Sequence, residues 1–478
     1  MALPSELRHH SIEPENGPLD HNPLAPVNPN APSTSPLDDR ASPRGRQASD
    51  NCDPPHHATN LRWQIAFLVS IAIAISYLDR QTLPVAIGAI GRDIPITNQT
   101  KAFLDSAFLI TYGLMYLGGG RLMDLLGTRR GFTLVMVFWS LACATQGLAT
   151  NVIMLAASRL LLGVGEGGGF PAATRVLAEW FPARERSMAM GIINGGTGLG
   201  AVIAPPLIAA ILLNVHWLKL SSWRWVFFIT GATGLVWTLW WVKSYFPPEQ
   251  HPGLAKTRAP LQQQETPPAP IPLFALLRFR ETWGIVTVKF LTDAAWYFYA
   301  FWLPKYLLDA RGFNIKEIGA VAWIPYAAGG VGCLLGGGLS SWLLHRGVSL
   351  NRARKIPLAL VVVVMPGIML VPHVSVPWCI ALFSLALFGH QWWSTLIMTL
   401  PTDLYPKRAV GTVAGLVGMG GAIGGVAFGQ FAGYLLDHGF TYSHVLAVAG
   451  SLHVVGYLLL LAVVRSLKPL PFDSPNPP

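Results

Sequence analysis

The sequence predicts an all-α membrane protein of twelve transmembrane helices, arranged as two six-helix halves. Of its 478 residues, 52% are hydrophobic and only 12% are charged. The mean hydropathy of +0.43 is well above that of a typical water-soluble domain. Long apolar runs recur along the chain, and the two halves repeat each other's polar loops, which together indicate a duplicated membrane protein.

The apolar runs are roughly 18 to 25 residues long, enough for a helix to cross a hydrocarbon core about 30 Å thick. Polar and apolar residues do not alternate along them, so strands are excluded as the main element. In chain order the predicted spans lie near 61–84, 103–123, 131–149, 152–176, 187–213, 223–245, 283–305, 317–343, 356–371, 377–401, 409–436 and 443–465.

The net charge of +10 comes from basic residues that cluster in alternate loops, as in a membrane protein. These are Arg121, Arg129, Arg130, Arg184, Arg186, Lys256, Arg258, Arg278, Arg280, Arg346, Arg352, Arg354, Lys355, Lys407 and Arg408. The intervening loops are nearly free of basic residues, apart from Arg92, Lys101, Lys219, Arg311 and Lys316. The positive-inside rule therefore predicts that both termini are cytoplasmic, and an even number of spans agrees.

Polar segments divide the chain. Residues 1–60 are rich in Pro, Asn, Asp, Ser and His and have no apolar core, which predicts a disordered cytoplasmic tail rather than a signal peptide. A Pro- and Gln-rich stretch at 247–281 predicts a cytoplasmic linker between a bundle at 61–246 and a second bundle at 282–466. Residues 467–478 form a predicted cytoplasmic C-terminal tail.

The two predicted bundles carry similar motifs at matching positions. Glu179-Trp-Phe-Pro-Ala-Arg184 follows the fourth span, and Asp403-Leu-Tyr-Pro-Lys-Arg408 follows the tenth. Each motif is an acid, an aromatic residue before proline, and then a base. This repeat is typical of transporters whose halves rock around a site that lies between them.

One polar loop resembles the signature loop of the major facilitator superfamily, with a leucine where that pattern usually has a basic residue. The loop follows the second span and contains Gly120, Asp124, Gly127, Arg129 and Arg130. The resemblance implies the major facilitator fold. We expect the Asp124 loop with Arg129 and Arg130 to form a cytoplasmic gate. Determination of topology alone is the alternative role of its charges.

Further motifs resemble the anion:cation symporter family within that superfamily. Tyr77-Leu-Asp79-Arg80 lies in the first span, and Arg159-Leu-Leu-Gly-Val-Gly-Glu166 lies in the fourth. Four more motifs resemble its hexuronate transporter branch, which is related to galactonate transporters; they begin at Ala178, Trp302, Ala322 and Leu350. The similarity covers nearly everything from residue 61 onward.

Ionisable residues inside spans indicate function, because each costs about 2.5–3.5 kcal/mol at a helix centre. Asp79, Arg80, Arg159 and Glu166 are such residues, and the last two share a helix face because they are seven residues apart. Two acids and two bases around one cavity are neutral when the cavity is empty. A bound anion adds a negative charge that one proton removes, so proton and anion should stabilise each other.

The resemblance assigns roles to these residues. It implies that Glu166 is a coupling carboxylate, that Asp79 is a second protonation site, and that Arg80 contacts the substrate carboxylate. Arg159 is the implied partner of the acids. The alternative is a static salt-bridge network that holds the helices together.

Polar and aromatic residues near the middle of spans could hold the hydroxyls and the ring of a sugar acid. The substrate-binding candidates are Tyr77, Tyr112, Asn194, Asp293, Trp296, Tyr297, His390, Gln391 and Trp393; the resemblance implies this role for Tyr77 and Tyr112. Packing between helices or a place in the headgroup belt is the alternative for each aromatic residue. Asp293 favours a substrate with one carboxylate, because it would repel a second.

These features predict a proton-coupled symporter that imports a sugar acid, either a hexuronate such as glucuronate or galacturonate or an aldonate such as galactonate. An exchanger or exporter of organic anions is the alternative, and a sensor without transport is a third. Catalytic and metal-binding motifs are absent, so neither an enzyme nor a cofactor is predicted, and protons are the coupling ion. The expected partners are the anion, protons and the lipid bilayer, without nucleic acid. A monomer in the inner (plasma) membrane is expected.

Overall fold

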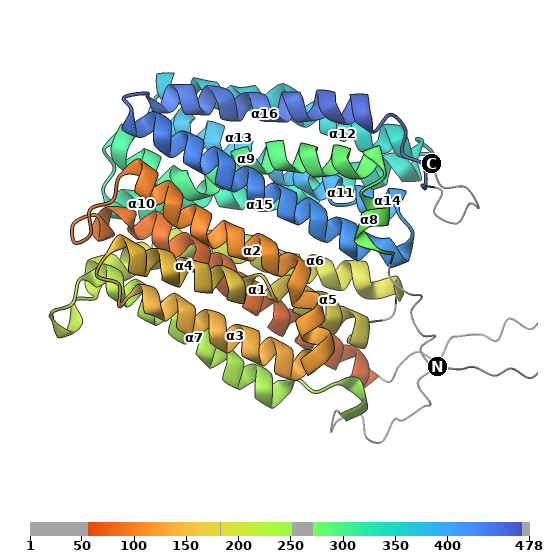
Figure 1. Ribbon diagram of the computed structural model, residues 1–478, viewed down its shortest axis with the longest axis horizontal. Coiled ribbons are helices and arrows are strands. Elements are labelled where there is room, and N and C mark those ends of the chain that lie inside the picture. The colour runs from red at the N-terminus through yellow and green to blue at the C-terminus, as the bar shows by residue number, and fades with distance from the viewer. Residues whose placement is uncertain (1–55, 182, 251–270, 471–478) are drawn as a thin grey trace, which may run out of the picture. The chain divides into compact units, whose positions relative to one another are not determined.

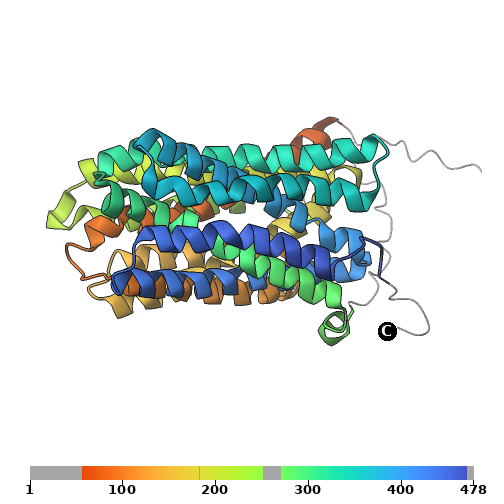
Figure 2. The ribbon, with the colours of Figure 1, turned by 90° about the horizontal axis from the view of Figure 1, so that it is seen from above.

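A computed structural model describes residues 56–181, 183–250 and 271–470. Within these ranges all regular structure is helical, without a strand. The axes of the long helices lie roughly parallel to one another (Figures 1 and 2). Helix α1 (His56–Ile90) begins and α16 (Tyr442–Val463) ends at one end of this bundle, which we call the terminal end. The opposite end, where α1 ends and α16 begins, is the distal end.

The first half of the described chain packs as one group of helices, which lies along one side in Figure 1. Helix α1 packs on α6 and α7, α2 packs on α4, and α3 packs on α4 and α7. The helices after α1 are α2 (Asn98–Leu126), α3 (Thr128–Gln146), α4 (Val152–Glu166), α5 (Gly169–Trp180), α6 (Ala183–Asn214) and α7 (Ser222–Ser244). Two 3-10 turns, η1 (Trp217–Lys219) and η2 (Pro248–Gln250), flank α7.

The second half packs in the same manner, with α9 against α15 and α16, and α11 against α13. A short helix, α8 (Leu273–Leu276), precedes it. Its other elements are α9 (Arg280–Arg311), α10 (Ile315–Val321), α11 (Trp323–His345), α12 (Leu350–Val364), the 3-10 helix η4 (Met365–His373), α13 (Val376–Ile397), α14 (Leu400–Leu404) and α15 (Lys407–Asp437).

Among the described residues, nine helical segments are long and apolar enough to cross a membrane. They coincide with nine of the predicted spans. The predicted spans near 103–123, 131–149 and 283–305 lie within α2, α3 and α9, which are helical along their whole length. The all-helical fold is thus confirmed, while the number of twelve spans stays a prediction. The predicted tail at 1–60 lies almost entirely outside the described residues, as does most of the linker at 247–281.

The fourth span of each half is interrupted between two helices, halfway along the span in the first half and close to the terminal end in the second. Helix α4 ends at Glu166 and α5 begins at Gly169, while α13 ends at Ile397 and α14 begins at Leu400. The sequence predicted one continuous helix in each place. Glycine has a low helix propensity, which explains the first break, and proline favours the first turn of a new helix, as Pro401 does in α14.

The two halves contact each other through α2 on α15 and through α6 on α10 and α11. At the distal end, the Asp437 carboxylate accepts hydrogen bonds from the backbone N–H of Asn98 at 3.0 Å and of Gln99 at 2.7 Å. The side-chain amide of Asn98 donates to the same carboxylate at 2.9 Å. We call these three residues the distal clasp, because they fasten the first turn of α2 to the end of α15.

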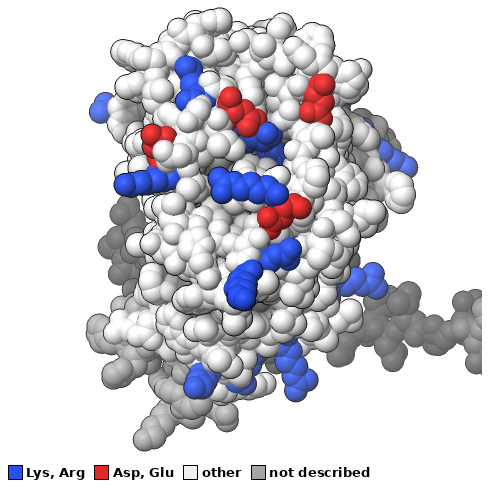
Figure 3. All heavy atoms as spheres, turned by 90° about the vertical axis from the view of Figure 1, so that its left-hand side faces the viewer, with Lys and Arg blue, Asp and Glu red and all other residues white. Residues whose placement is uncertain are grey.

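Charged residues differ between the two ends. Figure 3 looks onto the distal end and shows acidic side chains among the basic ones. The elements at this end carry Arg92, Asp93, Lys219, Arg224, Lys305, Asp309, Arg311, Lys316, Glu317 and Asp437. At the terminal end the described basic residues predominate, as in the segments 121–130 and 346–355. This asymmetry is the one that the sequence predicted.

Candidate functional site

Two residues singled out by the sequence form a buried ion pair where α1 meets the end of α4. Arg80 Nε donates to Glu166 Oε2 at 2.7 Å. The hydroxyl of Ser76, one turn earlier in α1, donates to the same oxygen at 2.8 Å. Arg80 is 5% exposed and Glu166 is 2% exposed. The carboxylate is therefore held by two donors from one helix, of which sequence reasoning found only the arginine.

Glu166 is the last residue of α4, directly before the break that leads into α5. Its neighbour Gly165 lies against Trp139 of α3: a Cβ at this glycine would be 2.4 Å from the Trp139 Cβ. Trp139 Nε1 in turn donates to Asp79 Oδ2 at 2.9 Å. Close approach of α4 to α3 therefore requires glycine here, and the same tryptophan of α3 binds Asp79 of α1.

Each of these two acids has one oxygen without a partner in the described part of the chain. Asp79 is fully buried, and its Oδ1 accepts no hydrogen bond there; the same is true of Glu166 Oε1. Burial penalises the charged form of a carboxyl group, and protonation removes this penalty. Each acid thus has one carboxylate oxygen that is not engaged by a described residue.

The Arg80 guanidinium lies against two tyrosine rings, as the predicted role of Tyr77 and Tyr112 requires. Its Cζ atom is 4.5 Å from the ring centroid of Tyr77 and 4.3 Å from that of Tyr112. Such cation–π contacts fix the plane of the guanidinium. A planar fork held in this way suits a carboxylate, which it can bind through two parallel hydrogen bonds.

Arg159 has a different partner from the one expected. Its Nη2 lies 3.6 Å from Asp105 Oδ1, and no ion pair joins it to Asp79 or Glu166 among the described residues. Lys101 Nζ lies 2.5 Å from Asp105 Oδ2. The sequence missed Asp105 and placed Lys101 in a loop; that placement is wrong, because Lys101 lies in α2 and is fully buried.

The spacing of Lys101 and Asp105 in the sequence could have predicted this ion pair. Lys101 and Asp105 are four residues apart, which places them on one face of a helix and lets the two charges neutralise each other. Asp79, Asp105 and Glu166 are buried in the first half together with Arg80, Lys101 and Arg159, and Arg62 is buried near the start of α1, where it pairs with Glu185. The neutrality expected of Asp79, Arg80, Arg159 and Glu166 as one group stays a prediction, because Arg159 pairs with Asp105.

The second half contains one further buried pair. Lys289 Nζ lies 2.9 Å from Asp293 Oδ1 and donates to Ser394 Oγ of α13 at 2.6 Å. Lys289 is 5% exposed and Asp293 is 6% exposed. Sequence reasoning missed Lys289, although it too stands four residues from its acid. The lysine compensates the charge of Asp293, so this acid alone gives no reason for repulsion of a second carboxylate.

Three other predicted residues lie near this pair. His390 Nε2 is 3.6 Å from Asp293 Oδ1, and the ring of Trp296 stacks on that of His390 with centroids 4.8 Å apart. Trp393 is fully buried and donates through Nε1 to Thr292 Oγ1 at 3.2 Å. Residues of α9 and α13 thus converge inside the second half.

The remaining substrate-binding candidates are more dispersed. The half-buried Tyr297 ring packs on Phe301, with centroids 5.6 Å apart, and Phe301 is 6.5 Å from Phe108 of the first half. Gln391 is half-buried and packs on Gly329 of α11. Asn194 lies on an exposed position of α6, and the structure does not bring it to the charged groups.

Only part of the predicted gate is described. Gly127 has a φ of 74° and joins α2 to α3, a conformation that favours glycine. Arg129 Nη2 donates to the backbone oxygen of Val242 at 2.5 Å, within the first half, and Arg130 is exposed. The surroundings of Gly120 and the side chain of Asp124 lie outside the described part of the structure, so the gate stays a prediction.

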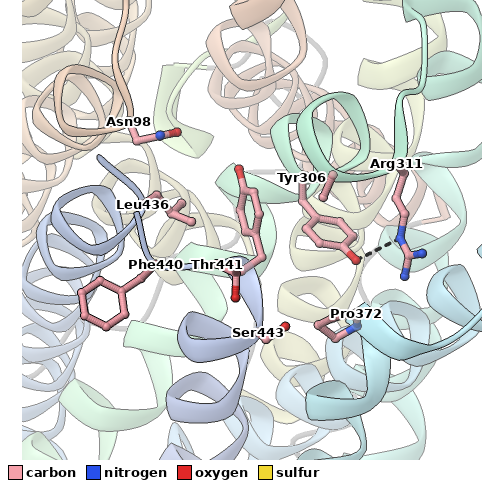
Figure 4. A pocket seen from close by; sticks show the side chains of 10 residues that line it. Asn98, Tyr306, Arg311, Pro372, Leu436, Phe440, Thr441 and Ser443 are labelled. Atoms are coloured by element: carbon pink, nitrogen blue, oxygen red, sulfur yellow. Dashed lines mark hydrogen bonds between the residues drawn. The ribbon is translucent and has the colours of Figure 1, made fainter. Parts of the chain in front are cut away.

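A pocket of about 380 Å³ opens at the distal end, away from the buried charges (Figure 4). Tyr306, Arg311, Thr441 and Ser443 line it from the second half, and Asn98 lines it from the first. Arg311 already donates to the Tyr306 hydroxyl at 3.0 Å and to the backbone oxygen of Val371. The pocket borders the distal clasp through Asn98 and lacks the acid–base pairs of the buried site.

Comparison with known proteins gives a consistent result. Residues 69–429 match the Major Facilitator Superfamily. The chain is 31% identical over 417 residues to the hexuronate transporter of Escherichia coli (strain K12), which covers 85% of this chain and 94% of that protein. It is 30% identical to a probable galactarate/D-glucarate transporter of the same strain, covering 86% and 95%.

The arrangement of the helices is also similar to that of a solved structure. A bacterial homologue of the human lysosomal transporter Spinster aligns with a TM-score of 0.66 at 17% identity, over 84% of this chain and 96% of that one. At this identity the likeness concerns the fold alone, and it agrees with the two groups of helices described above.

Proposed function

This chain belongs to the major facilitator superfamily, and on that premise we propose that it is a symporter that imports a sugar acid together with protons. It is a multi-pass membrane transporter and not an enzyme. The observation that carries the proposal is the buried Arg80–Glu166 pair, at 2.7 Å, beside two tyrosines and a second buried acid. A cation for the anion and an acid for the proton are thus in direct contact.

The pair couples the two ligands by competition for one charge. In the empty protein Glu166 neutralises Arg80. When a substrate carboxylate binds Arg80, it takes the place of Glu166, whose charge is then unpaired and buried. Protonation of Glu166 removes that cost, so proton and anion bind more tightly together than separately. Asp79, held by Trp139, is the second protonation site in this proposal.

The relatives support the substrate class. Transporters of hexuronate and of galactarate/D-glucarate are about equally similar to this chain, and all these substrates are sugar acids. Tyr77 and Tyr112 offer ring faces and hydroxyls beside Arg80, and Trp296, Tyr297, His390 and Gln391 offer the corresponding surface in the second half. Aromatic faces with a few polar groups are what a sugar ring needs.

The charge asymmetry of the two ends supports an orientation. The terminal end, with its excess of basic residues, is the cytoplasmic end in this proposal, so both termini are cytoplasmic and the distal clasp faces outward. The inner (plasma) membrane is the corresponding location, and a monomer contains the complete site. The loop around Asp124, Arg129 and Arg130 is then a gate at the cytoplasmic end.

Uptake into proteoliposomes tests the proposal. Labelled glucuronate, galacturonate and galactonate are supplied with and without an inward proton gradient, to the native protein and to Glu166→Gln. We expect the native protein to accumulate at least one of them about tenfold per pH unit at one proton per anion. Glu166→Gln should lose gradient-driven accumulation but keep exchange of labelled for unlabelled substrate, because its site no longer needs a proton to be neutral.

Glu317→Gln is the matched control, since Glu317 is an exposed carboxylate at the distal end and glutamine can replace it in the capping box of α10. It should behave as the native protein. Full proton-driven accumulation by Glu166→Gln would contradict the coupling role. If the native protein exchanges substrate at a rate that does not depend on the proton gradient, the alternative function, an organic-anion exchanger, would be favoured.

A further inference from the structure

The second half holds a cation–acid pair that the coupling proposed above does not use. Lys289 and Asp293 are 2.9 Å apart, as Arg80 and Glu166 are 2.7 Å apart in the first half. All four side chains belong to residues that are 6% exposed or less. Each half of the protein thus buries one salt bridge that is neutral as a unit and that an anion could open.

We propose that Lys289 binds a second carboxylate, so that the protein transports sugar diacids as well as sugar monoacids, and that Asp293 takes up one additional proton with the diacid. The inference rests on the proposed function, because it assumes that the first carboxylate binds Arg80. Lys289 is then the residue that extends the substrate class from hexuronates, which have one carboxylate, to aldarates, which have two.

Charge balance is the first argument. A monoacid at Arg80 is neutralised by one proton on Glu166. A diacid brings a second carboxylate, and the other buried cations of α2 and α4, Lys101 and Arg159, are already paired with Asp105. At Lys289 this carboxylate displaces Asp293, and a proton on Asp293 restores neutrality without leaving a buried charge unpaired.

The surroundings of the pair are the second argument. Lys289 also donates to Ser394 at 2.6 Å, so α13 still holds its ammonium group when Asp293 releases it. The titratable groups around the pair are two histidines and two tyrosines. His390 Nε2 is 3.6 Å from Asp293 Oδ1, His390 Nδ1 is 3.2 Å from His453 Nε2, and Tyr77 of α1 and Tyr297 of α9 interact electrostatically with Asp293. None of the four is a carboxylate, so these described residues add no negative charge that would oppose a second anion.

The position of the pair is the third argument. Helix α9, which carries Lys289 and Asp293, packs on α1, which carries Arg80. A row of rings connects the two sites: Phe108 lies beside Arg80, Phe301 beside Phe108, and Tyr297 beside Phe301. Tyr297 is one turn from Asp293. The two cations therefore belong to helices of the two halves that pack on each other.

The experiment compares galactarate, a six-carbon diacid, with galacturonate, the related monoacid, in proteoliposomes. The variants are Lys289→Arg, which keeps the charge, and the double variant Lys289→Gln/Asp293→Asn, which removes both charges and leaves no buried ion unpaired. We expect native uptake of both acids and one more proton per galactarate than per galacturonate, measured from the pH gradient at which a fixed substrate gradient gives no net flux. In the double variant the ratio of galactarate to galacturonate uptake should fall about tenfold to hundredfold; Lys289→Arg should retain it.

The outcomes separate the inference from the function on which it rests. Native uptake of galacturonate without galactarate would overturn the inference and leave the proposed function intact. Equal proton stoichiometries, or an unchanged uptake ratio in the double variant, would also overturn it. Absence of uptake for both acids and for the aldonate would overturn the proposed function and the inference together. Melting curves of each purified variant show whether the loss concerns folding.

Discussion

At the scale of single residues, the first half depends on one acid that serves two cations. Asp105 lies 2.5 Å from Lys101 Nζ and 3.6 Å from Arg159 Nη2, and all three residues are 3% exposed or less. An acid that neutralises two buried bases should be less replaceable than either base, because its loss leaves two charges without a partner.

We therefore expect Asp105→Asn to destabilise the protein by about 3 kcal/mol or more. Lys101→Met is the matched control: it leaves the Asp105–Arg159 pair neutral and should cost clearly less, although it also loses the contact of Lys101 with the Trp302 ring at 4.4 Å. The thermal midpoints of the purified variants, and their yield as monodisperse protein, measure the difference. Equal loss in the two variants would mean that Asp105 does not serve both cations.

Residue-level prediction from the sequence succeeded where a charge stood in the middle of an apolar run. Arg80 and Glu166 were expected to act together, and they are in contact. It failed where a base and an acid four residues apart neutralise each other, as Lys289 and Asp293 do. The sequence shows spacing along one helix, but the partner on another helix, such as Asp105 for Arg159, depends on packing that no spacing encodes.

At the scale of helices, glycines determine how closely α15 approaches α9. A Cβ at Gly424 would lie 1.9 Å from the backbone oxygen of Phe290. Backbone cannot yield as a side chain can, so Gly424→Ala must separate the two helices. We expect a loss of about 1–3 kcal/mol, typical of overpacking.

Gly429 of the same helix provides the control, since a Cβ there would meet nothing within 4 Å. Gly429→Ala should be neutral or slightly stabilising, because alanine is the better helix former. Thermal unfolding of both variants in the same detergent decides the question. A Gly424→Ala protein as stable as Gly429→Ala would show that α9 and α15 are not in the close contact described.

The length and apolarity of the runs predicted the transmembrane helices. They did not predict where a helix is interrupted within a span. The glycine-rich run from Gly163 to Gly169 ends α4 at Glu166. Hydrophobicity averages over a whole span, so it is insensitive to one broken turn. A glycine-rich stretch beside an intramembrane acid is the local signal that predicts such a break.

At the scale of the whole molecule, the repeat of two halves could be predicted, but the way they meet could not. A transporter that alternates between two arrangements must have a sequence compatible with both, so no pattern selects one of them. The structure has the halves joined at the distal end by the clasp of Asp437 with Asn98 and Gln99. Breaking this clasp should favour the arrangement that is open at that end.

Asp437→Ala tests this expectation. It removes the acceptor of three hydrogen bonds between the halves, and because Asp437 is exposed we expect a net effect of about 1 kcal/mol, or about fivefold in the population open at the distal end. Spin labels at Arg92→Cys and Lys316→Cys, exposed positions of the two halves at the distal end, report the separation once the four native cysteines have been replaced.

The control is Asp93→Asn, which removes a distal carboxylate whose partners lie within one half. Asp93 accepts hydrogen bonds from the hydroxyl of Ser221 and, at 2.8 Å, from Trp223 Nε1. These bonds hold the pKa of Asp93 below its ordinary value, so both distal carboxylates carry a charge at neutral pH and both variants remove one. A longer distance between the labels in Asp437→Ala alone would establish the clasp as a gate between the halves. An equal increase of the label distance in both variants would mean that the increase comes from the loss of a charge at the distal surface and not from the clasp.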